Sequence, residues 1–327
     1  MKAIVYHDYG PPEVLRWVEI AKPAPQAHEV LIRVRAASVN PVDWHFMRGL
    51  PRALRLGAGL HRPKQPRLGI DVAGEVEATG RTVTQFKPGD EVFGTGRGAF
   101  AEFVCAAEGN LVTKPPELSF EQAAAVPVAA LTALQGLRDK GGIRPGQSVL
   151  INGAAGGVGT FAVQIAKSFG ADATGVCSTR NVELVRSLGA DRVIDYTRDD
   201  FTRISRRYDL IFDCVGNHSF SARRRALVPK GVCVMVGGPN EGRWLGPLAG
   251  LLKAMLLSRF GPEKFVMILT RVGKQDDLTF LRDLLRARRV TPVVDRRYPM
   301  SEVAEAIRYL ETGHARGKVI LTVECGG

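Results

Sequence analysis

The spacing of apolar residues changes character along the chain. In about the first 120 residues the apolar runs are short, and Val30, Ile32 and Val34 would share one face of a strand. The segments GIDVAGEVEATG and DEVFGTG are further short strands bounded by glycine. This pattern predicts a small β barrel rather than a parallel sheet.

Strands and helices alternate in the rest of the chain. EQAAAVPVAALTALQGL predicts a helix that is kinked, or begins afresh, at Pro127. After it, apolar runs that predict strands enclose segments with helical periodicity; the strands are SVLIN, ATGVC, RVIDY, DLIFDCVG, GVCVMVGG and KFVMIL. Such alternation is typical of βαβ units, whose right-handed crossovers place the carboxyl ends of the parallel strands at one edge.

Two helices and one strand are predicted near the carboxyl terminus. DDLTFLRDLLRAR is an amphipathic helix with Leu278, Leu281 and Leu285 on one side. SEVAEAIRYLETG and GKVILTV follow as a helix and a strand. The fold class is therefore α/β, with a barrel-like part and a parallel-sheet part.

A glycine-rich turn separates the strand SVLIN from the helix after it. Its glycines are Gly153, Gly156, Gly157 and Gly159, a spacing that departs from strict GxGxxG. A turn of this kind lets backbone N–H groups face a ligand, and the helix N-terminus favours an anion. Its place in a βαβ series predicts a dinucleotide site; a merely tight turn is the alternative.

The end of the next strand bears on the choice of dinucleotide. NAD enzymes usually carry an acid there, which binds the ribose hydroxyls. Here the strand ends at Cys177, and Ser178 and Arg180 follow with no carboxylate before Glu183. Arginine pairs well with phosphate oxygens, so the segment favours NADPH, unless Arg180 is only a solvated residue at a helix start.

The charge distribution and the spacing of the cysteines bear on the partners and the cellular location that the sequence predicts. The formal net charge is +12, but the basic runs at 203–207, 223–225 and 286–289 are not interleaved with aromatic residues, so we expect no nucleic-acid partner. The five cysteines are widely spaced, which predicts reduced thiols and a cytoplasmic protein. The start of the chain does not resemble a signal peptide.

One strongly apolar segment, 244–257, stands apart from this pattern. It contains Pro247 and Lys253 and is shorter than the roughly 20 residues that span a bilayer, so membrane association is not expected. We predict a helix that flanks the substrate entrance; a dimer contact and membrane association are the alternatives.

The stretch GQSVLINGAAGGVGTFAVQIAK resembles the signature of the quinone oxidoreductase/ζ-crystallin branch of the medium-chain dehydrogenase/reductase superfamily. Other pieces that resemble this family are ASVNPVDWHFMRG, PRLGIDVAGEV, KPGDEVFG, PVAALTAL, DCVG and ARGKVILTV. The resemblance implies a GroES-like β-barrel catalytic domain at 1–122, a Rossmann NADP-binding domain at 123–272 and a return to the catalytic domain at 273–327. It also implies a homodimer.

The resemblance further implies that this chain carries no zinc. The positions that match the zinc ligands of relatives are Asn40, the pair Ile70-Asp71 and a position near Val128, and isoleucine and valine cannot ligate a metal. Asp43 and His45 could be imagined as ligands, but such residues more often orient backbone or substrate. Without a Lewis acid, an electrophilic acceptor such as an apolar quinone or an α,β-unsaturated carbonyl is expected.

Roles for individual residues follow from the same resemblance. Asn40 and Thr132 border the nicotinamide, and Asp43 orders the active-site loop. Trp44 and His45 stand where related reductases often place a tyrosine. Trp44 stacks on a planar substrate or fills core, and His45 donates a proton or is simply packed.

The cofactor side is expected to lie at the strand ends. Gly156, Gly157 and Val158 meet the pyrophosphate, and Ser178, Arg180 and Tyr196 surround the 2′-phosphate. Further residues expected beside the cofactor are Cys214, Val215, Gly237, Gly238 and Lys318.

These features predict an NADPH-dependent oxidoreductase that transfers hydride to a quinone or enone without zinc. Two alternatives stay open at this point, because a fold does not determine a function. One is an NADP-dependent alcohol dehydrogenase or carbonyl reductase. The other is a non-catalytic NADPH-binding structural or regulatory protein.

Overall fold

The structure is a computed structural model that describes residues 1–236 and 261–323 of the 327-residue chain. It divides into two compact units. Unit 1 comprises Met1–Leu131, Arg271–Arg288 and the chain from Pro292 onward. Unit 2 comprises Thr132–Thr270 and Arg289–Thr291.

A seven-stranded sheet forms the framework of unit 1. Its order is β14-β15-β3-β4-β5-β7, with β6 paired to β3. The strands are β3 (Glu29–Val39), β4 (Asp71–Thr79), β5 (Glu91–Thr95), β6 (Phe103–Ala107), β7 (Leu111–Thr113), β14 (Val294–Pro299) and β15 (Lys318–Thr322), and β1 (Lys2–Val5) and β2 (Arg16–Glu19) form a separate pair. All pairs in this sheet are antiparallel except β14 with β15.

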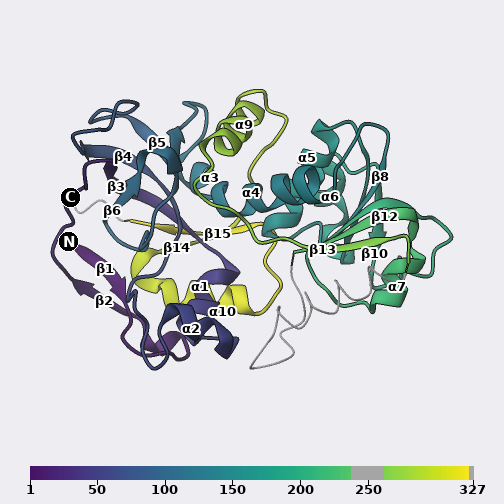
Figure 1. Cartoon of the computed structure of the whole chain (residues 1–327), viewed down its shortest axis with the longest axis horizontal. Helices are drawn as coiled ribbons and strands as arrows, with labels where there is room; N and C mark the ends of the chain where they lie inside the picture. The colour runs from purple at the N-terminus through teal and green to yellow at the C-terminus, as the bar shows by residue number, and fades with distance from the viewer. Residues whose placement is uncertain (237–260, 324–327) are drawn as a thin grey trace. The chain divides into compact units, whose positions relative to one another are not determined.

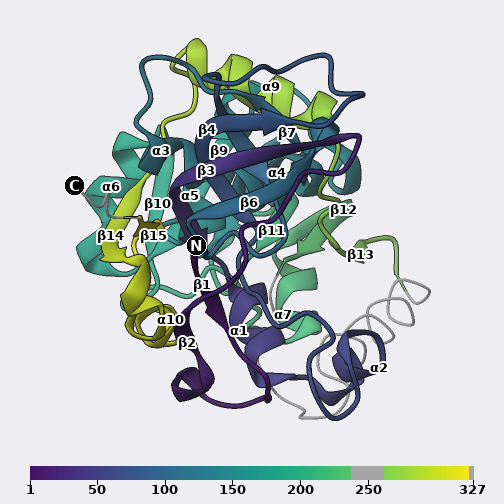
Figure 2. The ribbon, with the colours of Figure 1, turned by 90° about the vertical axis from the view of Figure 1, so that its left-hand side faces the viewer.

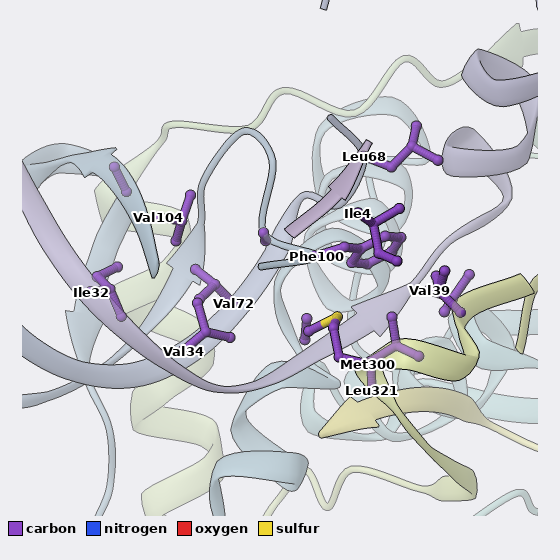
Figure 3. Packing of buried hydrophobic residues seen from close by; sticks show 14 of the residues in the cluster. Ile4, Ile32, Val34, Val39, Leu68, Val72, Phe100, Val104, Met300 and Leu321 are labelled. Carbon is purple, nitrogen blue, oxygen red and sulfur yellow. The ribbon is translucent and has the colours of Figure 1, made fainter. Parts of the chain in front are cut away.

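The core of unit 1 lies against one face of β3. Val30, Ile32 and Val34 are buried, as their alternation predicts. Figure 3 shows Ile32 and Val34 beside Val72 of β4 and Val104 of β6. Because β3 pairs with both β4 and β6, one apolar face holds these strands together.

Five α-helices belong to unit 1 within the described residues, apart from the start of the helix that leads into unit 2. They are α1 (Pro41–Arg48), α2 (Arg55–Ala58), α3 (Phe120–Ala124), α9 (Gln275–Arg286) and α10 (Val303–Glu311). α9 buries Leu278, Leu281 and Leu285, as predicted, and lies beside β7 (Figure 2). β15 follows α10 and joins the sheet beside β3, so the end of the chain completes unit 1.

Unit 2 is a six-stranded parallel sheet with helices on both faces. Its order is β10-β9-β8-β11-β12-β13, and the strands are β8 (Ser148–Asn152), β9 (Asp172–Cys177), β10 (Arg192–Asp195), β11 (Tyr208–Asp213), β12 (Leu227–Met235) and β13 (Lys264–Met267). Helices α5 (Gly157–Ser168) and α6 (Val182–Ser187) cover one face and α7 (Phe220–Arg225) the other (Figure 1). The strand order reverses between β8 and β11, which is where doubly wound sheets bind ligands.

The helical segment around Pro127 is two helices, of which α3 ends at Ala124 and α4 (Pro127–Gln135) begins afresh. α3 packs on β3 and β4, and the compact unit runs on through Leu131. The boundary at 122 expected from sequence therefore falls inside α3, because the helix that follows the barrel still packs on its sheet. A π-helical turn at Gly136–Lys140 then leads to β8.

Two of the sequence-based predictions lie outside the described residues. These are the roles of Gly237 and Gly238 and of the 244–257 segment. In the part of the chain that is described, no helix is both long enough and apolar enough to cross a bilayer.

Candidate functional site

The glycine turn of unit 2 lies at the carboxyl end of β8, where the strand order reverses. Gly153 has φ +83°, and a Cβ there would lie 2.8 Å from Val215 Cγ2. A Cβ on Gly159 would lie 2.1 Å from the carbonyl oxygen of Gly153. These two glycines are therefore required by the turn itself.

Gly156 differs, because no described residue requires it to be glycine. It has φ −82°, and among the described residues a Cβ there would meet only the carbonyl oxygen of Gly153, at 3.4 Å. It is the N-cap of α5, and no described side chain caps the first N–H groups of that helix. Gly156, Gly157 and Val158 are partly exposed, so this backbone fits the close approach of an anion such as a pyrophosphate.

Asp213, at the end of β11, organises the other side of the reversal point. Its Oδ1 accepts hydrogen bonds from Asn152 Nδ2 at 2.9 Å and from the backbone N–H groups of Val215 at 3.0 Å and Gly216 at 2.8 Å. Its Oδ2 lies 2.8 Å from Nε of Arg223, and both side chains are buried. Sequence reasoning missed this pair, although an acid that ends a buried strand was a usable signal.

Asp213 thereby determines where Cys214 and Val215 lie. The N–H of Cys214 donates to the carbonyl of Asn152 at 3.0 Å, and Val215 lies over Gly153. Burial raises the pKa of the Cys214 thiol, so it is protonated at neutral pH. Cys214 therefore contributes shape at this edge rather than a thiolate.

The residues predicted to surround a 2′-phosphate come together at the ends of β9 and β10. The N–H of Tyr196 donates to the carbonyl of Cys177 at 3.0 Å, which places Tyr196 next to Ser178. Asn181 Nδ2 donates to Ser178 Oγ at 3.1 Å, and both Arg180 and Tyr196 are exposed. The three predicted residues thus share one exposed edge.

A carboxylate that sequence reasoning missed also lies at this edge. Asp195 ends β10, and Thr179 Oγ1 donates to it at 2.6 Å and Thr197 Oγ1 at 2.8 Å. The hydrogen bond from Thr179 is the largest of several effects that lower the pKa of Asp195. The acid comes from the neighbouring strand, and hydroxyl groups of the protein already occupy both its oxygens.

Thr132 is the remaining predicted residue in unit 2. It is buried in α4, and its Oγ1 lies 2.6 Å from Oγ1 of Thr270. The hydroxyl of Thr132 is therefore engaged with a second threonine.

Unit 1 carries a buried polar cluster around the start of α1. Asn40 directly precedes this helix, and its Nδ2 donates to Asp71 Oδ2 at 2.8 Å. Its Oδ1 accepts from Lys318 Nζ at 2.6 Å. Both ends of the Asn40 amide are thus occupied by protein groups.

Asp43 ties the start of α1 to the segment before β4. Its Oδ2 accepts from the N–H of Asn40 at 2.7 Å, and its Oδ1 accepts from the N–H of Gly69 at 3.2 Å. Burial raises the pKa of Asp43 to about 7, against the opposing effect of these two N–H groups. Asp43 thereby holds two backbone segments together.

Asp71 and Lys318 complete the cluster from two different strands. Asp71 lies in β4, and its Oδ1 accepts from the N–H of Val128 at 2.9 Å. Lys318 Nζ lies 3.5 Å from Asp71 Oδ2, and burial lowers the pKa of Lys318. Sequence reasoning named Asp71 only as a non-matching zinc position; the signal was a charged residue in the apolar run of β4.

Two family models match separate stretches of the chain. Residues 26–116 match the alcohol dehydrogenase GroES-like domain, and residues 188–321 match a family described as zinc-binding dehydrogenase. The chloroplast envelope quinone oxidoreductase homolog of Arabidopsis thaliana is 34% identical, over 98% of both chains. The chain belongs to the medium-chain dehydrogenase/reductase superfamily, in its quinone oxidoreductase branch.

Two further comparisons bear on fold and cofactor. The quinone oxidoreductase from Coxiella burnetii has a TM-score of 0.86 and 32% identity over 99% of both chains. The NADPH-dependent alkenal/one oxidoreductase of Arabidopsis thaliana is 36% identical over 98% of this chain and 79% of its own. The predicted fold class is confirmed, and the comparisons support the prediction of an NADPH-dependent oxidoreductase.

Helix α1 carries two neighbouring ring side chains, Trp44 and His45, at the place where related reductases often have a tyrosine. The rings of Trp44 and His45 stack with centroids 3.7 Å apart, and Trp44 also packs on the core of unit 1. His45 Nδ1 donates to the carbonyl of Leu50 at 2.8 Å, and burial lowers the pKa of His45. At neutral pH the ring is therefore uncharged with its only N–H already used, an arrangement that does not favour a proton donor.

The zinc-ligand positions of the family can be placed in unit 1. Asn40 and Asp71 belong to the buried cluster, and the backbone N–H of Val128 is bonded to Asp71. Among the described residues, no group of three or more histidine, cysteine or acidic side chains lies close enough together to hold a metal ion. The match named zinc-binding dehydrogenase covers 188–321 and so includes none of these positions.

Proposed function

We propose that this protein is an NADPH-dependent reductase that transfers hydride to a quinone or an α,β-unsaturated carbonyl compound and needs no zinc. One observation carries the proposal. At the family's zinc-ligand positions, both oxygens of Asp71 already accept hydrogen bonds from the protein, and Asn40 has its whole amide engaged. A catalytic zinc wants three protein ligands and an open position, and these residues do not offer them.

The chain's own residues suit the cofactor. Gly156, Gly157 and Val158 would hold the pyrophosphate, and Ser178, Arg180 and Tyr196 would hold the 2′-phosphate. When bound, NADPH supplies the hydride. The protein's part is to position the acceptor and to exclude water.

If the enzyme needs no zinc, as proposed, its hydride acceptor should be a compound that reacts without a Lewis acid. Quinones and enones accept hydride at carbon and a proton afterwards, whereas an unactivated carbonyl or alcohol benefits from a metal. Relatives named quinone oxidoreductase and alkenal/one oxidoreductase support this choice. An alcohol dehydrogenase or carbonyl reductase and a non-catalytic NADPH-binding protein stay as alternatives, to be separated by assay.

The test is NADPH oxidation by the purified protein with a quinone panel, an enone panel and simple aldehydes, together with elemental analysis. We expect turnover with quinones or enones, weak or no turnover with aldehydes, and well under one zinc per chain. Activity that a chelator removes and zinc restores would reject zinc independence. NADPH binding without turnover of any acceptor would favour the non-catalytic alternative.

Replacing Arg180 by alanine is expected to weaken NADPH binding and to leave NADH binding nearly unchanged. Loss of a charge-assisted contact with the 2′-phosphate costs roughly 1.5–3 kcal/mol, which is more than about 10-fold in Kd. The measurement is the Kd of each cofactor by fluorescence titration.

Arg186→Ala is the matched control for this prediction. Arg186 lies on α6 and pairs with Glu183 at the surface, so its loss should change neither Kd. Equal losses for NADPH and NADH in Arg180→Ala would contradict the assignment of this edge to the 2′-phosphate.

The quaternary structure and location of the protein stay predictions made from sequence. We propose a homodimer in the cytoplasm, which gel filtration with light scattering and cell fractionation would test.

A further inference from the structure

The buried polar cluster of unit 1 joins parts of the chain that are far apart in sequence. We call it the Asp71 cluster; its members are Ser38, Asn40, Asp71 and Lys318. Asp71 is fully buried and Lys318 is 4% exposed. Taking such a pair of charges out of water is costly unless the partners are well placed, and apolar residues of similar volume are often as stable.

Each oxygen of Asp71 is used as an acceptor. Oδ2 accepts from Ser38 Oγ at 2.6 Å and from Asn40 Nδ2 at 2.8 Å, with Lys318 Nζ at 3.5 Å. Oδ1 accepts from the N–H of Val128 at 2.9 Å. The carboxylate thus connects β3, the start of α1, α4 and β15, and no neutral side chain can accept at both oxygens in this way.

Lys318 determines which way the Asn40 amide faces. Its ammonium donates to Asn40 Oδ1 at 2.6 Å and to the carbonyl of Val39 at 3.4 Å. The reversed amide would point its NH₂ group at the ammonium and its oxygen at the Asp71 carboxylate, both repulsive. The two charges therefore hold one orientation of Asn40.

The cluster also anchors the helix through which the chain leaves unit 1. Asp71 accepts from Val128 in the first turn of α4, and the same helix contains Leu131 and Thr132, where the chain passes into unit 2. The Asp71–Lys318 ion pair therefore holds both the orientation of the Asn40 amide and the position of the first turn of α4.

We propose that Lys318 is a positioning residue of the reductase: with Asp71 it holds Asn40 and the start of α4 in one arrangement, and the rate of hydride transfer depends on that arrangement. The inference rests on the proposed oxidoreductase function. It differs from a purely structural role, in which loss of Lys318 would lower stability but leave turnover per folded molecule unchanged.

Lys114 offers a matched control in the same unit. It is also a buried lysine, 6% exposed, and it pairs with Glu91 at 2.9 Å and donates to the carbonyl of Leu118 at 2.7 Å. It lies outside the Asp71 cluster. Lys114→Met therefore removes a buried ammonium of similar environment without touching Asn40.

The experiment compares Lys318→Met, Lys114→Met and the unaltered full chain. The acceptor is whichever quinone, enone or aldehyde the unaltered protein reduces fastest, so a wrong substrate class counts against the proposed function and not against this inference. We expect Lys318→Met to lower kcat by about 10- to 100-fold, since small misplacements of reacting groups have effects of this size. For Lys114→Met, both the Kd for NADPH and kcat should stay within about two-fold of the unaltered protein.

Thermal unfolding of both variants shows whether a loss of kcat accompanies a loss of stability or arises without one. A kcat of Lys318→Met close to that of the unaltered protein, or equal proportional losses of kcat in the two lysine variants, would overturn the inference.

If Lys318→Met does not fold, Lys318→Gln decides in the same way. Its amide can still donate to Asn40 but carries no charge, so we expect a reduced kcat, and an unchanged kcat would overturn the inference.

Discussion

Replacing Arg223 by methionine is expected to destabilise unit 2 by about 3–5 kcal/mol, because it leaves the Asp213 carboxylate buried without its partner charge. Arg223 Nε lies 2.8 Å from Asp213 Oδ2, with the two side chains 5% and 0% exposed. The N–H of Arg223 Nε does not point at the carboxylate, so the contact is an ion pair rather than a directed hydrogen bond. The measurement is thermal unfolding, with an expected fall in Tm on the order of 10 °C.

Two further variants make this expectation specific. Arg224→Met removes the neighbouring arginine, whose pair with Glu263 is more exposed, and should cost no more than about 1 kcal/mol. Adding Asp213→Asn to Arg223→Met removes the unpaired charge while Oδ1 can still accept from Val215 and Gly216, so part of the stability should return. If Arg223→Met and Arg224→Met lose similar amounts of stability, the loss in Arg223→Met does not come from breaking the buried ion pair.

The strands of both units follow from local sequence patterns. Alternation at Val30, Ile32 and Val34 identifies a strand with one buried face, because side chains alternate across a sheet. The apolar run of β8 identifies a strand buried on both faces, as expected in a parallel sheet covered by helices. In both cases the signal lies within a few residues, so no knowledge of distant partners is needed.

The polar partners inside the two units could not be found in this way. Asn40 and Lys318 are separated by 278 positions, and Asn152 and Asp213 by 61. A hydrogen bond across such distances depends on which strands become neighbours, and the local pattern around each residue does not contain that information. The same reason explains why Asp195 was missed: it is absent from the strand that ends at Cys177 and arrives from β10.

The sequence pattern does identify a glycine turn, but it does not say which glycines serve the fold and which leave space for a ligand. That distinction needs the surroundings of each Cα atom. Gly159 faces the carbonyl of Gly153, whereas a Cβ on Gly156 would meet no atom of the described residues closer than 3.4 Å.

Gly156→Ala is expected to leave the fold intact and to weaken the binding of NADPH and NADH alike, by more than about 10-fold, because a methyl group would stand where the pyrophosphate approaches the start of α5. Its backbone has φ −82°, which alanine adopts without strain, so the Tm should hardly change. Gly159→Ala is the opposite case: its Cβ would lie 2.1 Å from the carbonyl oxygen of Gly153, and such overpacking costs about 1–3 kcal/mol or more.

The measurements are Tm and the Kd of both cofactors for each variant. Equal weakening of both cofactors by Gly156→Ala, set against the NADPH-specific loss in Arg180→Ala, separates the pyrophosphate contact from the 2′-phosphate contact. If Gly156→Ala binds both cofactors as tightly as the unaltered protein, the dinucleotide does not lie over this turn.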